Sequence, residues 1–191
     1  MIGKDNKYDA VIVGAGVSGL FMFYKLRNMG LSVLVIEKSD ELGGTWNWNR
    51  YPGARCDIPS LEYSYQFDED LQQEWNWSEK YSAGPEILEY LNHVAEKFDL
   101  KDYINFEEEV IQAKFNEDSC LWSVSTNKQK YVAKFCIFAT GCLSIPNKPE
   151  IPGLESFEGK LLHTATWPRE EQNFTDKNVA IIGTGSSSIQ T

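Results

Sequence analysis

The feature that most constrains the fold is a glycine-rich motif that directly follows a short apolar run. Residues 8–13 are largely β-branched and apolar, which is typical of a buried parallel strand. The motif that follows is Gly14-Ala15-Gly16-Val17-Ser18-Gly19, of the form G-x-G-x-x-G. Residues 18–29 then show the apolar spacing of a helix, and 32–36 predict a second strand. Together these segments predict a right-handed βαβ unit.

The spacing of this motif indicates a dinucleotide-binding turn. Gly14 permits a tight turn, Gly16 lets the backbone approach a pyrophosphate, and Gly19 lets the helix lie close to the strand. The helix N-terminus then faces the anionic phosphates. Glu37 stands at the end of the second strand, where it is placed to accept hydrogen bonds from a ribose 2′-OH and to disfavour a 2′-phosphate. A glycine-rich turn without a ligand is the alternative, which the βαβ context makes the weaker hypothesis.

A second motif of the same kind lies near the end of the sequence. Residues 178–182 predict another apolar strand, which stops at Gly183. Gly183-Thr184-Gly185-Ser186-Ser187-Ser188 follows, with Ser188 where a third Gly or Ala is usual, so the match is weaker. The sequence stops three residues later, before a helix could complete two turns. We therefore expect Thr191 to be a truncation rather than a native terminus.

The segments between the two motifs predict an α/β fold with an antiparallel meander. Residues 43–65 form a long stretch dense in Gly, Pro, Trp and Tyr, and such ordered loops are often functional. A helix is predicted over 85–98, and three extended runs follow, at 110–115, 121–126 and 131–138. The last run is apolar enough to re-enter the parallel sheet. Glu107-Glu108-Glu109 is expected to be a solvated turn or edge.

Composition and charge exclude several classes of function. The formal net charge of −10 disfavours nucleic-acid binding. The four Cys form no C-x-x-C pair, so we expect no metal site. Because the sequence contains no apolar stretch of membrane-spanning length and no signal-peptide pattern, a cytoplasmic protein without a membrane span is expected.

Two further segments carry a family resemblance. The segment Gly43-Gly44-Thr45-Trp46-Asn47-Trp48-Asn49-Arg50-Tyr51-Pro52-Gly53-Ala54-Arg55-Cys56-Asp57 resembles the flavin-proximal segment of Baeyer–Villiger monooxygenases. Phe157-x-Gly159-x-x-x-His163-x-x-x-Trp167-Pro168 is similar at every specified position to that family's fingerprint, F-x-G-x-x-x-H-x-x-x-W-P. Related flavin-containing monooxygenases and N-hydroxylases share the glycine motifs but typically lack the Trp-Pro ending. The resemblance covers 8–191.

The resemblance implies an enzyme that uses FAD and NADP(H). In this family NADPH reduces FAD, and the reduced flavin uses O₂ to insert one oxygen atom into a ketone, which gives an ester or a lactone. The partners are thus a small-molecule ketone and O₂. The implied organisation is a Rossmann-like FAD-binding domain over 1–145, a linker with the fingerprint over 146–176, and the start of a Rossmann-like NADP-binding domain over 177–191.

Site residues are carried over from the family motif by motif. Asp57 resembles the aspartate that pairs with an active-site arginine and supports the anionic oxygenating flavin, and that arginine belongs to a part of the family's chain beyond Thr191. His163 resembles a linker residue that couples domain movement to catalysis. The residues implied in FAD binding are Gly14, Ala15, Gly16, Ser18, Gly19, Glu37, Lys38, Gly44, Thr45, Trp46, Arg55, Cys56, Asp57, Tyr63 and, through its backbone, Val110. Those implied in NADP binding are Gly183, Thr184, Gly185, Ser186, Ser187, Ser188 and Gln190.

Alternative interpretations accompany these predictions. Trp46 and Trp48 are each open to a purely packing role, and His163 to that of a hydrogen-bonded structural histidine. At the level of function, the alternatives are a flavin-containing N- or S-monooxygenase, and an FAD-binding remnant without activity. Because the partner arginine is absent from the sequence, we expect these 191 residues alone not to catalyse the full reaction.

Overall fold

The computed structural model describes residues 6–191, and its internal contacts divide the chain into two compact units. The first unit contains the residues up to Asn47 together with Leu88–Gly141, and the second contains Trp48–Ile87 together with Cys142–Thr191. The three domains expected from the sequence are functional divisions and stay a prediction.

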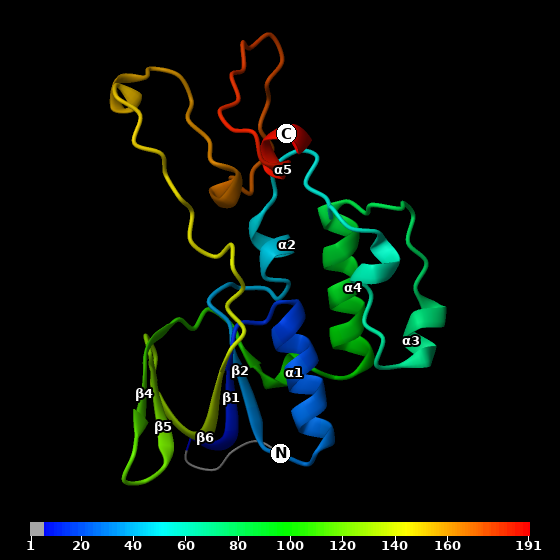
Figure 1. The fold of residues 1–191 in the computed structure, drawn as a ribbon, viewed down its shortest axis with the longest axis vertical. Coiled ribbons are helices and arrows are strands. Elements are labelled where there is room, and N and C mark those ends of the chain that lie inside the picture. The colour runs from blue at the N-terminus through cyan, green and yellow to red at the C-terminus, as the bar shows by residue number, and fades with distance from the viewer. Residues whose placement is uncertain (1–5) are drawn as a thin grey trace. The chain divides into compact units, whose positions relative to one another are not determined.

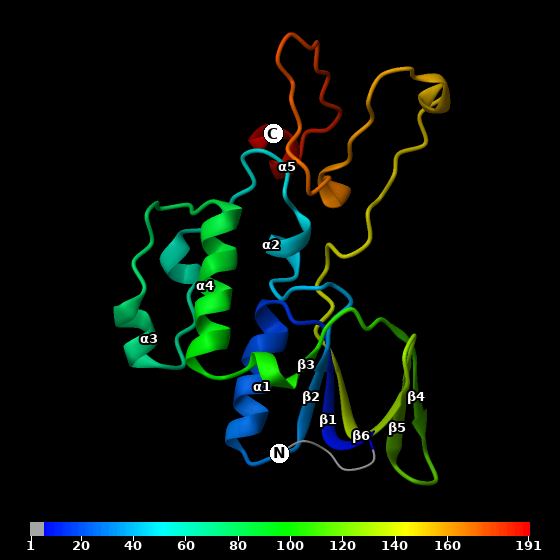
Figure 2. The same ribbon diagram turned by 180° about the vertical axis from the view of Figure 1, so that it is seen from behind.

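The first unit is built on a six-stranded sheet with the strand order β3-β2-β1-β6-β5-β4. Strands β3, β2, β1 and β6 run parallel to one another, whereas β5 is antiparallel to both β6 and β4. In Figure 1, α1 lies beside β1 and β2, and Figure 2 shows β3 beyond β2 on the side away from the β4–β5 hairpin. The bounds are β1 Lys7–Val13, α1 Val17–Asn28, β2 Val33–Ile36, β3 Ile104–Asn105, β4 Val110–Asn116, β5 Leu121–Thr126 and β6 Lys130–Phe138.

The βαβ unit forms where the glycine motif predicts it. All four residues of β2 are buried, as expected of an inner parallel strand. Helix α1 turns Gly19, Leu20 and Phe23 to the interior. The predicted α/β class is therefore confirmed. The strand that was expected to re-enter the parallel sheet is confirmed as well, because β6 pairs in parallel with β1.

The second unit contains short elements joined by loops. Helix α3 (Glu69–Glu74) is capped at its N-terminus by Asp68, whose side chain accepts a hydrogen bond from the Leu71 backbone N–H at 2.8 Å. The remaining elements are α2 Thr45–Trp48 and α4 Gly84–Lys97, which both continue into the first unit, α5 Ser186–Gln190, and the 3₁₀ turns Ser60–Tyr63, Lys101–Tyr103 (in the first unit), Leu154–Ser156 and Thr164–Thr166. No helix among residues 6–191 has the length and apolar character needed to cross a membrane.

The strand expected over 178–182 is not formed. Val179, Ile181 and Ile182 are each more than half exposed, and no strand is assigned in this segment. A strand is stabilised by hydrogen bonds to a neighbouring strand, and no other segment of residues 6–191 pairs with this one. Apolar pattern alone therefore predicted more structure than this segment has.

Candidate cofactor-binding sites

The first glycine turn is closed by backbone contacts that leave no space for a side chain at Gly14 or Gly19. Gly14 has a φ of +104°, and a Cβ there would lie 2.6 Å from the Ala139 carbonyl oxygen. A Cβ on Gly19 would lie 1.9 Å from the carbonyl oxygen of Gly14. Both distances are too short for any side chain, so the close approach of α1 to β1 and of β6 to the turn requires glycine at both positions.

The tip of this turn faces a second glycine pair. The Gly43 N–H donates to the Ala15 carbonyl oxygen at 3.0 Å, which joins the long loop to the turn. A Cβ on Gly44, whose φ is +53°, would lie 3.0 Å from the Cα of Gly16. Backbone thus faces backbone at Gly16 and Gly44, an arrangement that suits a pyrophosphate held by peptide N–H groups.

Glu37 stabilises the glycine turn through hydrogen bonds from its side-chain carboxylate. Its side chain is 5% exposed, and its Oε2 accepts a hydrogen bond from the Ala15 N–H at 2.7 Å. Its Oε1 accepts another from the Ser39 N–H at 2.8 Å. A carboxylate oxygen has two acceptor sites, so each oxygen keeps one for a further donor such as a ribose hydroxyl. That ribose contact stays a prediction, while the fixing of the turn by Glu37 is a contact of this structure.

The hydrogen bond between Asn47 and Ser39, two polar residues near this site, was not predicted from the sequence. Asn47 is 2% exposed, and its Nδ2 donates to the Ser39 Oγ at 2.6 Å, which ties helix α2 to the loop after β2. Thr45 and Trp46 belong to the same short helix, where Trp46 is half-buried. The exposed end of α2 is Trp48. Only the position of Asn47 inside the long glycine-rich loop could have suggested its role.

The expectation that Glu107-Glu108-Glu109 is simply solvated is wrong for its middle residue. Glu108 is 2% exposed, and its Oε1 accepts hydrogen bonds from the Thr126 Oγ1 at 2.6 Å and the Tyr131 hydroxyl at 2.9 Å. Its Oε2 accepts from the Asn105 Nδ2 at 3.1 Å. Burial, together with the bond to the Glu108 carboxylate, raises the pKa of Tyr131 to about 12. Sequence reasoning missed this network because its members become neighbours only through strand pairing.

The hydrogen-bonded network around Glu108 contacts the backbone of Glu37, just after the end of β2. The Glu108 N–H donates to the Glu37 carbonyl oxygen at 2.9 Å, and the Glu37 N–H donates to the Asn105 carbonyl oxygen at 2.9 Å. Val110, which was expected near the adenine, begins β4 two residues further on. Lys38 lies at the surface and forms an ion pair with Glu109 at 2.8 Å. The first unit therefore brings the first glycine turn, Glu37 and Gly44 together into one site.

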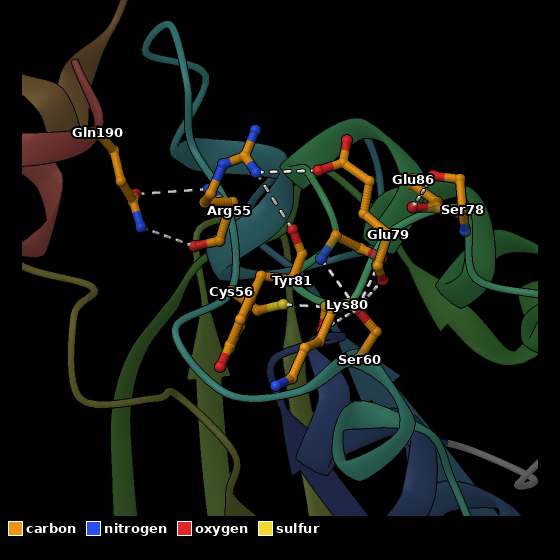
Figure 3. Close-up of polar contacts among 10 residues, drawn as sticks. Arg55, Cys56, Ser60, Ser78, Glu79, Lys80, Tyr81, Glu86 and Gln190 are labelled. Carbon is orange, nitrogen blue, oxygen red and sulfur yellow. Dashed lines mark hydrogen bonds and ion pairs between the residues drawn. The ribbon is translucent and has the colours of Figure 1, made fainter.

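The later part of the segment that resembles the family's flavin-proximal segment, from Trp48 to Asp57, lies in the second unit and is held at its backbone. Cys56 donates its N–H to the Ser82 carbonyl oxygen at 3.1 Å, and its buried thiol lies 4.0 Å from the Ser60 Oγ. The Arg55 side chain pairs with Glu79 at 3.0 Å, as Figure 3 shows. Asp57 follows with an exposed side chain, and Tyr63 is half-buried in a 3₁₀ turn.

The second glycine motif forms its turn without a strand in front of it. Gly183 has a φ of +143°, and helix α5 begins at Ser186. The Ser188 Oγ donates to the Gly185 carbonyl oxygen at 2.7 Å, so the serine in the third motif position is accommodated. A Cβ on Gly185 would meet no atom within 4 Å. Thr184 lies in the turn, Ser186 and Ser187 begin helix α5, and their NADP contacts stay predictions.

His163 is bonded through both ring nitrogens to the backbone of its own segment. Its Nδ1 accepts from the Ala165 N–H at 3.1 Å, so the proton lies on Nε2, which is 3.2 Å from the Asn147 carbonyl oxygen. This geometry is that of a hydrogen-bonded histidine that stabilises a turn, which matches the structural alternative considered from the sequence. The linker role of His163 stays a prediction.

Comparison with known proteins gives a consistent family assignment. A family model described as "Pyridine nucleotide-disulphide oxidoreductase" matches residues 11–191. Among curated proteins, the "Baeyer-Villiger monooxygenase" of Pseudooceanicola batsensis is 44% identical over 191 residues, which is 99% of this chain and 34% of that protein. The "Acetone monooxygenase (methyl acetate-forming)" of Gordonia sp. is 44% identical over 183 residues, which is 95% of this chain and 34% of that protein.

A solved structure agrees with these relatives. The crystal structure of OTEMO in complex with FAD and NADP is 38% identical, superposes with a TM-score of 0.89, and is matched over 96% of this chain and 36% of its own. The chain thus spans about a third of the length of the relatives that it matches. These similarities confirm the resemblance predicted from the fingerprint.

Proposed function

Because the chain belongs to the pyridine nucleotide-disulphide oxidoreductase family, we propose that it is the FAD-binding part of a Baeyer–Villiger monooxygenase. The whole enzyme would use NADPH and O₂ to convert ketones into esters or lactones. The observation that carries this proposal is the backbone cradle of Gly14, Gly16 and Gly44 above the buried carboxylate of Glu37. The acetone monooxygenase among the relatives favours a ketone as the substrate class.

The backbone of the cradle suits the anionic pyrophosphate of FAD. The start of α1 adds the positive end of its dipole, and no side chain protrudes at Gly16 or Gly44. The Glu37 carboxylate suits a ribose with free hydroxyls and repels a ribose phosphate, which distinguishes FAD from NADP at this turn. FAD, when bound, supplies the redox chemistry of hydride acceptance and oxygen activation.

Asp57 is proposed to orient the guanidinium of an arginine beside the flavin. A carboxylate next to a guanidinium favours the charged form of both and fixes the direction of the planar fork. The Asp57 side chain is exposed, as this pairing requires, and the neighbouring Cys56 backbone is tied to Ser82. Tyr63 is proposed to line the same region, while the second glycine motif would bind NADP(H).

Titration of the chain with FAD tests the cofactor assignment. Quenching of flavin fluorescence should be saturable, and Gly16→Val should weaken it strongly because the added side chain points at Gly44. The matched control is Gly185→Ala in the second motif, where a Cβ meets no atom within 4 Å. No quenching with a chain that circular dichroism shows to be folded would refute FAD binding.

The reaction itself is tested on a full-length enzyme that contains this chain as its FAD-binding part. NADPH consumption that depends on a ketone and yields an ester supports the proposal. Consumption with amines or thioethers but never with ketones would instead support the alternative of N- or S-oxygenation. FAD binding without NADPH consumption would support the third alternative, a protein that only binds the cofactor.

A further inference from the structure

Gln190 makes contacts that a role in cofactor binding does not explain. Its side-chain Oε1 accepts a hydrogen bond from the Arg55 backbone N–H at 3.4 Å, and its Nε2 donates to the Arg55 carbonyl oxygen at 3.1 Å. Figure 3 shows the side chain of Gln190 directed at the backbone of Arg55 with both bonds drawn. One amide thus satisfies both polar groups of one residue, 135 positions away in the chain.

The pairing of the neighbouring residues explains why Arg55 needs this partner. Arg55 forms an antiparallel bridge with Ala83, in which the Ala54 carbonyl oxygen accepts from the Gly84 N–H at 2.7 Å and the Cys56 N–H donates to the Ser82 oxygen at 3.1 Å. In such a bridge the N–H and C=O of the central residue point to the opposite edge. The side-chain amide of Gln190 occupies that edge and replaces one residue of a missing neighbouring strand.

Two further contacts place Gln190 on the same side of this segment. The Tyr51 hydroxyl donates to the Gln190 Oε1 at 2.9 Å. A Cβ on Gly53 would lie 2.0 Å from the Gln190 carbonyl oxygen, so only glycine allows this approach. Tyr51, Gly53 and Arg55 therefore all meet Gln190, on the turn that the Ala54 N–H closes onto the Tyr51 carbonyl oxygen at 3.2 Å. All three side-chain bonds agree on a single orientation of the amide.

We propose that Gln190 is a positioning residue that holds the backbone of Arg55 and thereby sets the placement of Asp57. The residue belongs to the helix of the second glycine motif, so it ties the proposed NADP(H) motif to the segment that carries the carboxylate beside the flavin. The contact itself belongs to this structure. Its meaning for the reaction rests on the proposed function.

Amide hydrogen exchange in the 191-residue chain, followed residue by residue by NMR, tests the proposal. Gln190→Leu removes the acceptor of the Arg55 N–H, and exchange at Arg55 should accelerate by about tenfold or more. The Gly84 amide, bonded to Ala54 on the other edge, should keep its rate. Gln190→Glu keeps an acceptor but loses the donor to the Arg55 carbonyl, so its effect should lie between Leu and wild type.

The control variant is Ile189→Ala, which changes a side chain of the same helix that is 81% exposed and should leave Arg55 unaffected. Unchanged exchange at Arg55 in Gln190→Leu would overturn the proposal. Equal acceleration at Arg55 and Gly84 would also overturn it, because that result describes general loosening. The Asp57 amide resonance should shift in Gln190→Leu but not in Ile189→Ala.

The same samples titrated with FAD separate this inference from the proposed function. If FAD does not bind but Arg55 responds to Gln190→Leu as described, the cofactor assignment fails and the positioning role stands. If FAD binds but Arg55 does not respond, the positioning role alone fails.

Discussion

The two glycine motifs share one sequence pattern but differ in how far the pattern becomes structure. The first follows strand β1, which has paired neighbours on both sides, and its turn is enclosed by backbone from Ala139 and Gly44. The second has a glycine turn and a short helix, but residues 178–182 before it are exposed and form no strand. The turn conformation is thus encoded locally, whereas the strand depends on neighbours that supply hydrogen bonds.

The comparison also separates two uses of the same glycines. In the first motif a side chain at the third position would clash with backbone at 1.9 Å, while in the second motif Ser188 occupies this position and bonds to Gly185. A glycine that is required by packing in one motif is therefore replaceable in the other. Substitutions in each of the two motifs measure this difference.

The largest effect is expected for Gly19→Ala. The added methyl would overlap the Gly14 carbonyl oxygen, so α1 must move away from β1. We expect the free energy of unfolding to fall by about 2 kcal/mol and FAD affinity to fall about 30-fold or more. Urea denaturation and flavin fluorescence measure the two quantities. Gly185→Ala in the second motif is the control, and a similar loss in that variant would show that the two motifs do not differ.

Glu37→Gln is expected to have the next largest effect. The amide offers one acceptor oxygen where the carboxylate accepts from the N–H groups of both Ala15 and Ser39. One buried N–H then faces an NH₂ group, at a cost of about 1 to 3 kcal/mol, and FAD affinity should fall with it. The exposed ion pair of Lys38 with Glu109 provides the control, since Glu109→Gln should cost less than about 1 kcal/mol. Equal losses in both variants would contradict the role of Glu37.

Removal of the Tyr131 hydroxyl should lower the free energy of unfolding, because it breaks the hydrogen bond to Glu108. It should also change how the free energy of unfolding depends on pH. Because the folded-state pKa of Tyr131 is raised to about 12, the tyrosine contributes stability that is complete below the unfolded pKa of about 10. That stability is lost as the pH rises through this interval. Tyr131→Phe should cost about 1 kcal/mol at neutral pH and should flatten the decline between about pH 10 and 12.

Denaturant unfolding across this pH range checks the prediction for Tyr131. Tyr81, which is 40% exposed in the second unit, provides the control through Tyr81→Phe. A decline of the same steepness in wild type and Tyr131→Phe would show that other groups cause it.

The smallest effect is expected for Ser188→Gly, which completes the G-x-G-x-x-G pattern of the second motif. The substitution removes the bond from Ser188 to the Gly185 carbonyl oxygen and adds backbone freedom to a short helix. The free energy of unfolding should fall by less than about 1 kcal/mol. Urea denaturation beside Gly19→Ala gives the ratio of the two effects. A gain in stability would mean that the second motif has the close packing of the first.

Sequence patterns predicted the first unit well because its signals are local. Period, glycine spacing and turn residues located β1, α1, β2 and the meander, and even the return of β6 to the parallel sheet. The partners of Glu108 were not predictable in the same way, since Asn105, Thr126 and Tyr131 meet it only once the strands have paired. A run of acidic residues by itself is typical of a solvated surface.

The candidate sites show the same division. The glycines and Glu37 were predicted as binding residues from their spacing, because the chemistry of pyrophosphate binding dictates that spacing. The contact of Gln190 with Arg55 depends on a bridge between Arg55 and Ala83, and no periodic pattern in the sequence predicts that bridge. Residues that act through the backbone of a distant loop are therefore the ones that sequence reasoning misses.

The strand order of the first unit has a consequence for how the protein folds. β1 pairs with β6, and the Asp9–Lys134 ion pair beside this junction joins residues 125 positions apart. Closing so long a loop is slow compared with forming the β1–α1–β2 unit. During synthesis the first glycine motif leaves the ribosome long before β6 and Ala139, which pack against its turn, have been made. We therefore expect the nascent chain to form the proposed FAD site only after β6 has been synthesised and has paired with β1.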